Sequence, residues 1–109
     1  MIQYMITHET KGLVDNYTLR ETGHAGFAEE GKDIVCSAVS AITVTLAQRI
    51  EDLSQTECDG NVYTEIEPGK AFIYCQCPRG NAKVREAFEF AELGLRMISA
   101  QYPEHVQMS

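Results

Sequence analysis

Hydrophobic and polar residues alternate along the first part of the chain, which is the pattern of strands with one buried face. Residues 1–8 alternate in this way, and residues 13–22 repeat the alternation. The mostly polar residues 9–12 between them fit a turn. The pattern therefore predicts two strands joined as a hairpin.

Two later segments instead place apolar residues at steps of three and four, which is the period of an amphipathic helix. The first covers residues 34–53 and follows Asp33, a residue type that suits a helix N-cap. The second covers residues 84–102 and ends before Pro103. Within it, Gly94 costs about 1 kcal/mol of helix propensity relative to alanine, which indicates close packing against the first helix.

A second hairpin is predicted between the two helices. Residues 62–67 and 70–77 have the composition of strands, and they flank Pro68-Gly69, a pair that suits the centre of a type II turn. The resulting ββαββα order predicts a single α+β domain over residues 1–109. Its expected architecture is a two-layer sandwich, with two helices on one face of a largely antiparallel sheet.

The other face of that sheet is left without a covering layer. Tyr63, Phe72 and Tyr74 are candidates for this open face, given the strands in which they lie. A contiguous apolar patch on an exposed face favours contact with another protein chain. We therefore expect a homodimer.

The charge of the chain narrows the classes of partner. Its formal net charge is −7 and its isoelectric point is near 4.8. Phosphate contacts need clustered Lys and Arg, so we expect no direct nucleic-acid partner and favour a basic protein or peptide. The apolar runs are expected to be too short to cross a bilayer, and the amino terminus lacks a signal-peptide pattern. A cytoplasmic protein without membrane contact is therefore predicted.

Four cysteines raise the questions of disulfides and metal binding. Without an export signal, we expect reduced thiols. Cys75 and Cys77 would share one strand face, and Cys58 or a histidine could join them at a metal. No Cys-x-x-Cys pair exists, so partly buried thiols and no metal are expected. His8 and His105 lack a partnering motif and are assigned no role.

The segment "GHAGFAEEGKDIVC" carries the residues with the clearest chemical potential. His24 is expected at the end of the second strand, and Cys36 in the first turn of the helix that Asp33 caps. The free N–H groups and the positive dipole end of that turn stabilise a thiolate and are candidate donors to an oxyanion. Residues 25–32 can curl back, so the imidazole and the thiol could meet as a Cys–His pair for nucleophilic catalysis.

Two further residues have open roles in that site. Asp33 could cap the helix or orient His24 as a third catalytic member. Ser40 lies one turn after Cys36 on the same helix face and could hydrogen-bond within the site. From residue chemistry alone, a cysteine that only packs in the core and a histidine that only occupies a turn are the more common cases.

Residues 23–42, "GHAGFAEEGKDIVCSAVSAI", resemble the ribosomal-processing cysteine protease (Prp) family. The similar order of strands and helices and the terminal "QYPEHV" extend the resemblance over essentially the whole chain. The positions that match the family pattern are Gly23, His24, Ala25, Gly31, Asp33, Ile34, Val35, Cys36 and Ser40.

The resemblance implies a cysteine endopeptidase with Cys36 as the nucleophile and His24 as the general base. Asp33 and Ser40 would be supporting site residues, and no metal or organic cofactor is implied. Members of the family are small homodimers with a mobile loop between the histidine and the cysteine. The candidate lid here comprises Ala25, Gly26, Phe27, Ala28, Glu29, Glu30 and Gly31.

The family removes a short N-terminal extension from large-subunit ribosomal protein L27 in Firmicutes and related bacteria. Its substrate has bulky apolar residues before the cut, so the resemblance implies a hydrophobic pocket near Cys36. A basic ribosomal substrate would also suit the acidic chain and the loop residues Glu29 and Glu30.

This chain departs from the family pattern in two places. Ser37 stands where many members carry Ala, and the loop sequence "GFAEE" is its own. Two alternatives are a relative of phage type that processes a phage structural protein and a non-catalytic dimer that binds another protein.

Overall fold

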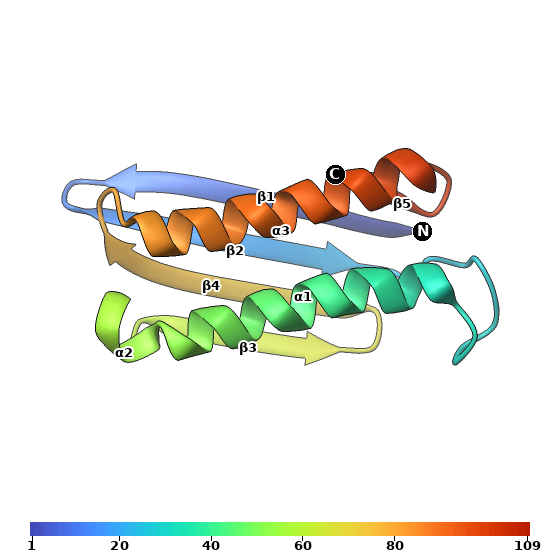
Figure 1. Cartoon of the computed structure of the whole chain (residues 1–109), viewed down its shortest axis with the longest axis horizontal. Coiled ribbons are helices and arrows are strands. Elements are labelled where there is room, and N and C mark those ends of the chain that lie inside the picture. Colours follow the sequence, from blue (N-terminus) through green and yellow to red (C-terminus); the bar gives the residue numbers. More distant parts are fainter.

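The computed structural model describes residues 1–109 as a five-stranded sheet with two long helices on one face (Figure 1). The strand order across the sheet is β3-β4-β2-β1-β5. The predicted ββαββα order is confirmed. In chain order the elements are β1 (Ile2–Lys11), β2 (Val14–Thr22), α1 (Ile34–Asp52), α2 (Ser54–Glu57), β3 (Val62–Glu67), β4 (Lys70–Pro78), α3 (Ala82–Gln101) and β5 (Val106–Met108).

Two short elements were not predicted. The four-residue helix α2 follows α1, and the three-residue strand β5 follows α3. Neither is long enough to show a hydrophobic period. Strand β5 pairs in parallel with β1, with Ile2 opposite Val106, whereas the other pairs are antiparallel. The sheet is therefore mixed, and its carboxyl-terminal strand lies beside the amino terminus.

The first hairpin turn is tighter than expected. Strand β1 continues to Lys11, so residues 9–11 belong to the strand, and only Gly12 and Leu13 connect it to β2. The polar residues stay in the ladder because each has a partner on β2; Thr10 pairs with Asp15. A prediction from composition alone missed this backbone pairing.

Asp15 holds this end of the sheet together. Its buried carboxylate accepts hydrogen bonds from the Thr10 hydroxyl and from the Gly80 N–H at 2.9 Å. His8 Nε2 lies 3.0 Å from the same carboxylate, and the His8 ring stacks on Tyr17 with centroids 4.5 Å apart. His8 thus has a structural contact that sequence reasoning did not assign.

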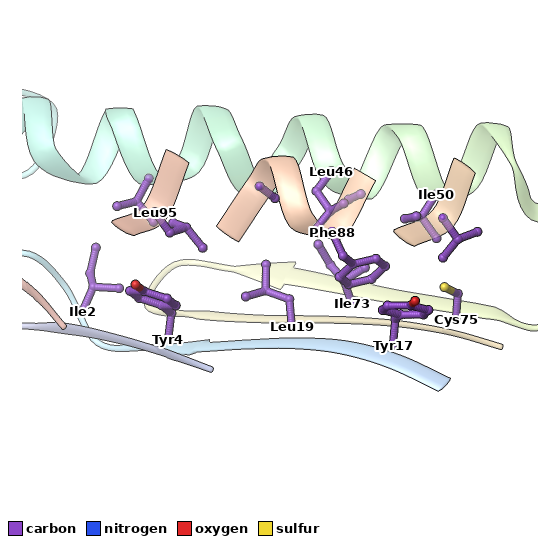
Figure 2. Close-up of a cluster of buried hydrophobic side chains, with 14 of the residues drawn as sticks. Ile2, Tyr4, Tyr17, Leu19, Leu46, Ile50, Ile73, Cys75, Phe88 and Leu95 are labelled. Atoms are coloured by element: carbon purple, nitrogen blue, oxygen red, sulfur yellow. The ribbon is translucent and has the colours of Figure 1, made fainter. Parts of the chain in front are cut away.

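The core lies between the sheet and the two long helices (Figure 2). Helix spacing is set by Gly94, where a Cβ atom would come within 2.7 Å of Ile42 Cδ1. The predicted close packing of the helices is therefore confirmed. The core side chains labelled in Figure 2 are Ile2, Tyr4, Tyr17, Leu19, Leu46, Ile50, Ile73, Cys75, Phe88 and Leu95.

Helix α1 is long and apolar enough to cross a membrane, with 19 residues and a mean hydropathy of 1.3. The expectation that no segment reaches this length and composition was wrong. In the fold, its apolar stripe, including Val39, Leu46 and Ile50, is buried in the core. The apolar residues that give α1 this hydropathy thus include those that pack in the core.

The open sheet face carries the three aromatic residues predicted for it. Ile73 and Cys75 are buried on the helix side, so Phe72 and Tyr74 point the other way. Tyr63 lies directly opposite Tyr74 in the ladder. The Arg20 guanidinium covers the Phe72 ring at 4.6 Å from its centroid. The face is therefore partly polar, and the homodimer stays a prediction.

The cysteines are all free thiols. Cys58, Cys75 and Cys77 are buried, and the expected shared face of Cys75 and Cys77 is confirmed. Burial raises the pKa of the Cys77 thiol to about 11. Cys36 is the one cysteine with a partly exposed side chain.

Candidate active site

A cleft of about 500 Å³ opens where the end of β2, the start of α1 and the β3–β4 turn meet. Four residues predicted for the site line it, together with part of the loop between them and the turn around Gly69. The fold therefore brings the predicted site residues to one place. These four are His24, Asp33, Cys36 and Ser40.

Asp33 acts as the N-cap of α1. Its Oδ1 accepts from the N–H groups of Val35 and Cys36 at 3.0 and 2.9 Å. Its Oδ2 accepts from Phe27 and Ala28 in the loop, at 2.9 and 3.2 Å. Burial alone would raise the pKa of Asp33, but these four N–H donors outweigh it and lower the pKa. Asp33 makes no hydrogen bond to His24, so the capping role is the one observed.

Cys36 occupies the third position of α1 and is partly exposed. Because Asp33 takes the N–H groups of Val35 and Cys36, these two are not free to hold an oxyanion as expected. A different donor reaches the sulfur: the Ala25 N–H donates to Cys36 Sγ across 3.3 Å. This amide belongs to the residue that follows His24.

His24 lies just beyond the end of β2, as predicted, and its side chain is exposed to the cleft. Its ring rests against Gly69 of the β3–β4 turn, where a Cβ atom would come within 2.7 Å of Nε2. Its carbonyl accepts a hydrogen bond from the amino terminus of Met1. The ring makes no hydrogen bond to Cys36 in this structure, although both line the cleft.

The loop is fixed at its two ends rather than free along its whole length. Ala25 is buried, while Gly26, Ala28, Glu30 and Gly31 line the cleft. Asp33 holds the N–H groups of Phe27 and Ala28, and the Lys32 N–H donates to the Glu29 carbonyl at 3.0 Å. Residues from both halves of the candidate lid therefore face the site.

The carboxyl-terminal segment supports the first half of this loop. His105 Nδ1 lies 2.8 Å from the Ala25 carbonyl oxygen. The Phe27 ring meets Tyr102 and His105 edge-on, with centroids 5.5 and 5.4 Å away. Sequence reasoning assigned His105 no role, since eighty positions separate it from Ala25.

Ser40 lines the cleft one helical turn after Cys36 and is exposed. Its hydroxyl makes no hydrogen bond within the protein, so it is free to bind a ligand. The neighbouring Ser37 hydroxyl instead donates to the Asp33 carbonyl at 3.1 Å.

Sequence reasoning also missed a buried polar pair in the cleft, Glu21 and Thr43. The Thr43 hydroxyl lies 2.8 and 2.7 Å from the two carboxyl oxygens of Glu21. Burial raises the pKa of Glu21, and the Thr43 hydrogen bond offsets this only in part. The signal was available, because Glu21 follows Tyr17 and Leu19 on the inward face of β2.

A family model described as cysteine protease Prp matches residues 1–107. A curated relative from Mycoplasma genitalium, the ribosomal processing cysteine protease Prp, is 36% identical over 86 residues. That match covers 77% of this chain and 78% of the relative.

Two solved structures share the fold. The Staphylococcus aureus ribosomal processing protease Prp, in complex with a covalently linked product peptide, matches with a TM-score of 0.77 and 23% identity. The match covers 100% of this chain and 98% of that one. A Streptococcus mutans protein matches with a TM-score of 0.66 and 29% identity, covering 100% and 92% of the two chains.

Proposed function

Since the chain belongs to the Prp family and is a cysteine peptidase, we propose that Cys36 is its nucleophile and His24 its general base. The observation that carries this proposal is their shared cleft, in which the Ala25 N–H donates to the Cys36 sulfur. The three other thiols are buried, so Cys36 is the cysteine that a peptide can reach.

In the proposed reaction, His24 takes the proton of Cys36 and the sulfur attacks the carbonyl carbon of the scissile peptide bond. His24 then gives the proton to the leaving amine, which leaves a thioester on Cys36. Water hydrolyses the thioester, and the carboxylic acid product and the free thiol are released. The ring of His24 lies against Gly69 and makes no hydrogen bond to Cys36 in the structure, so the first step requires the two side chains to come within hydrogen-bonding distance.

Two neighbouring residues support this chemistry in the proposal. Asp33 fixes the start of α1 and thereby the position of Cys36, through hydrogen bonds to both the helix and the loop. Ser40 has a free hydroxyl in the cleft and would hydrogen-bond the backbone of the bound peptide.

The proposed substrate is the N-terminal extension of large-subunit ribosomal protein L27. The relative named as a ribosomal processing protease supports this choice, as does the charge of −7, which suits a basic ribosomal protein. A ribosomal substrate implies that the reaction takes place in the cytoplasm. The expected homodimer is part of this proposal, and sedimentation at several concentrations would test it.

Cleavage of a synthetic peptide provides the direct test. A peptide spanning the L27 extension and the first mature residues would be incubated with the protein and followed by mass spectrometry. Cys36→Ala and His24→Ala should each reduce cutting by at least about a thousandfold, given the role of each group in every turnover. Ser37→Ala is the matched control, because it removes a neighbouring hydroxyl and leaves the thiol.

Cutting that persists in Cys36→Ala would remove the nucleophile assignment. Cutting of a phage structural peptide, with the L27 peptide left intact, would keep the chemistry and replace the substrate.

A further inference from the structure

A buried carboxyl group lies in the same cleft as Cys36 and His24. Glu21 is 8% exposed, and its side chain reaches from the end of β2 to Thr43 on α1. No Lys, Arg or His forms an ion pair with it. Ionising a buried acid without a cation beside it costs free energy, so Glu21 has an unmet need for a positive counter-charge in this cleft.

The acceptors around the Thr43 hydroxyl bear on the protonation of Glu21. The single hydroxyl hydrogen of Thr43 faces three acceptors: the two Glu21 oxygens and the Val39 carbonyl, which is 2.9 Å away. A protonated Glu21 resolves this, since it donates to Thr43 while Thr43 donates to Val39. The burial that raises the pKa of Glu21 acts in the same direction. Both observations favour protonation of Glu21.

We propose that Glu21 and Thr43 form the floor of a pocket that selects a lysine or arginine side chain of the cleaved peptide. This inference rests on the peptidase function proposed above and names the substrate chemistry of that site. A cation beside Glu21 supplies the missing counter-charge, so the acid gives up its proton and forms a charge-assisted hydrogen bond. An aliphatic side chain in the same place would bury the acid with no such compensation.

The other charged groups of the cleft favour a cation as well. Asp33 is saturated by four backbone N–H groups. Glu30 and Glu67 are exposed carboxylates at the rim, without an ion pair. The amine of Lys70 pairs instead with Glu65, at 3.7 Å. A cleft with an excess of carboxylates attracts a basic peptide and discriminates against an acidic one.

Paired peptides test the pocket. At each position on either side of the cleaved bond, lysine would be compared with norleucine, which has an unbranched aliphatic side chain and no charge. We expect one position at which lysine raises kcat/KM by about tenfold or more, the size of one hydrogen bond to a charged group. Glu21→Gln should abolish this preference, and Glu21→Leu should reverse it in favour of norleucine. Circular dichroism would verify that both variants fold.

Glu86→Gln is the matched control, because it removes one negative charge from an exposed position on α3, outside the cleft. It should retain the lysine preference. If no position favours lysine, or if the preference survives in Glu21→Gln, the pocket assignment is wrong.

Binding separates this inference from the peptidase proposal. The same peptides, labelled with a fluorophore, would be titrated with Cys36→Ala and with the double variant Cys36→Ala/Glu21→Gln, and anisotropy would report affinity. If the lysine peptide binds more tightly and this difference depends on Glu21, the pocket is supported. If the wild-type protein nevertheless cuts neither peptide, the peptidase assignment of the site is contradicted while the pocket stands. Equal binding of the two peptides, or binding of neither, would overturn the pocket even if other peptides are cut.

Discussion

The Ala25 N–H donates a hydrogen bond to the Cys36 sulfur across 3.3 Å, although eleven positions separate the two residues. The carbonyl of the same alanine meets His105 at 2.8 Å. One peptide segment therefore connects the carboxyl-terminal part of the fold to the proposed nucleophile. Because His24 immediately precedes Ala25, these two hydrogen bonds also constrain the backbone position of His24 beyond the end of β2.

His105→Ala should reduce kcat/KM about fivefold to tenfold, because the loss of one hydrogen bond of about 1 kcal/mol loosens the Ala25 amide beside the thiol. We expect the decrease mainly in kcat, since His105 does not line the cleft. His105→Gln, which keeps a side-chain donor, should recover part of the rate. Peptide cleavage kinetics would measure this. A KM effect of the same size would indicate a role in binding instead.

Gly69→Ala should impair catalysis beyond its effect on stability. Gly69 has φ +76°, and an added Cβ would meet His24 Nε2 at 2.7 Å. Gly12→Ala is the matched control: φ there is +61°, but no atom lies within 4 Å of the added Cβ. Each substitution should lower the free energy of unfolding by about 1 kcal/mol, because both force alanine into the left-handed region.

Only Gly69→Ala should lower kcat/KM, since only it displaces the His24 ring. Urea denaturation and peptide cleavage, measured on both variants, would check this. Equal activity in the two variants would show that the contact between Gly69 and His24 has no bearing on the reaction.

Alkylation should modify a single cysteine in the folded protein. Cys36 is partly exposed, whereas Cys58, Cys75 and Cys77 are buried, and burial also raises the pKa of each of these three thiols. At a pH of about 7.5, below the pKa of about 8.5 of a free cysteine, iodoacetamide should therefore add one carbamidomethyl group, at Cys36. Peptide mapping by mass spectrometry would identify it. Rapid modification at Cys75 would contradict the burial of this thiol in the core.

Asp15 should make stability depend on pH in the acid range. Hydrogen bonds from Thr10, from the Gly80 N–H and from His8 lower the pKa of Asp15 from 3.8 to about 2. Since the folded-state pKa is depressed, the stabilisation is fully present above 3.8 and is lost as the pH falls toward about 2. Asp15→Asn should thus be less stable than the wild type at neutral pH, and the difference should shrink over that window.

Urea denaturation at a series of pH values would measure this difference. Asp59→Asn is a suitable control, because Asp59 is exposed and makes no side-chain hydrogen bond or ion pair. If the difference in free energy of unfolding between Asp15→Asn and the wild type stays constant across this pH range, the lowered pKa of Asp15 does not stabilise the fold.

Local patterns in the sequence determined much of the fold. The period of two predicted the first hairpin and the period of three to four predicted the two long helices, because side-chain burial repeats with the geometry of each element. The Pro68-Gly69 turn predicted the second hairpin. Asp33 as N-cap and Cys36 in the first helical turn followed from the same boundary. These features depend on residues close together in the chain, so a single sequence suffices to infer them.

The tertiary structure alone decided the contacts between distant segments. Strand β5 is too short to show a period, and its parallel pairing with β1 brings His105 to Ala25 across eighty positions. The pairing of Glu21 with Thr43 likewise depends on how α1 lies over the sheet. Such contacts follow from the packing of whole elements, which no local spacing encodes, and they determine which groups surround the thiol in the cleft.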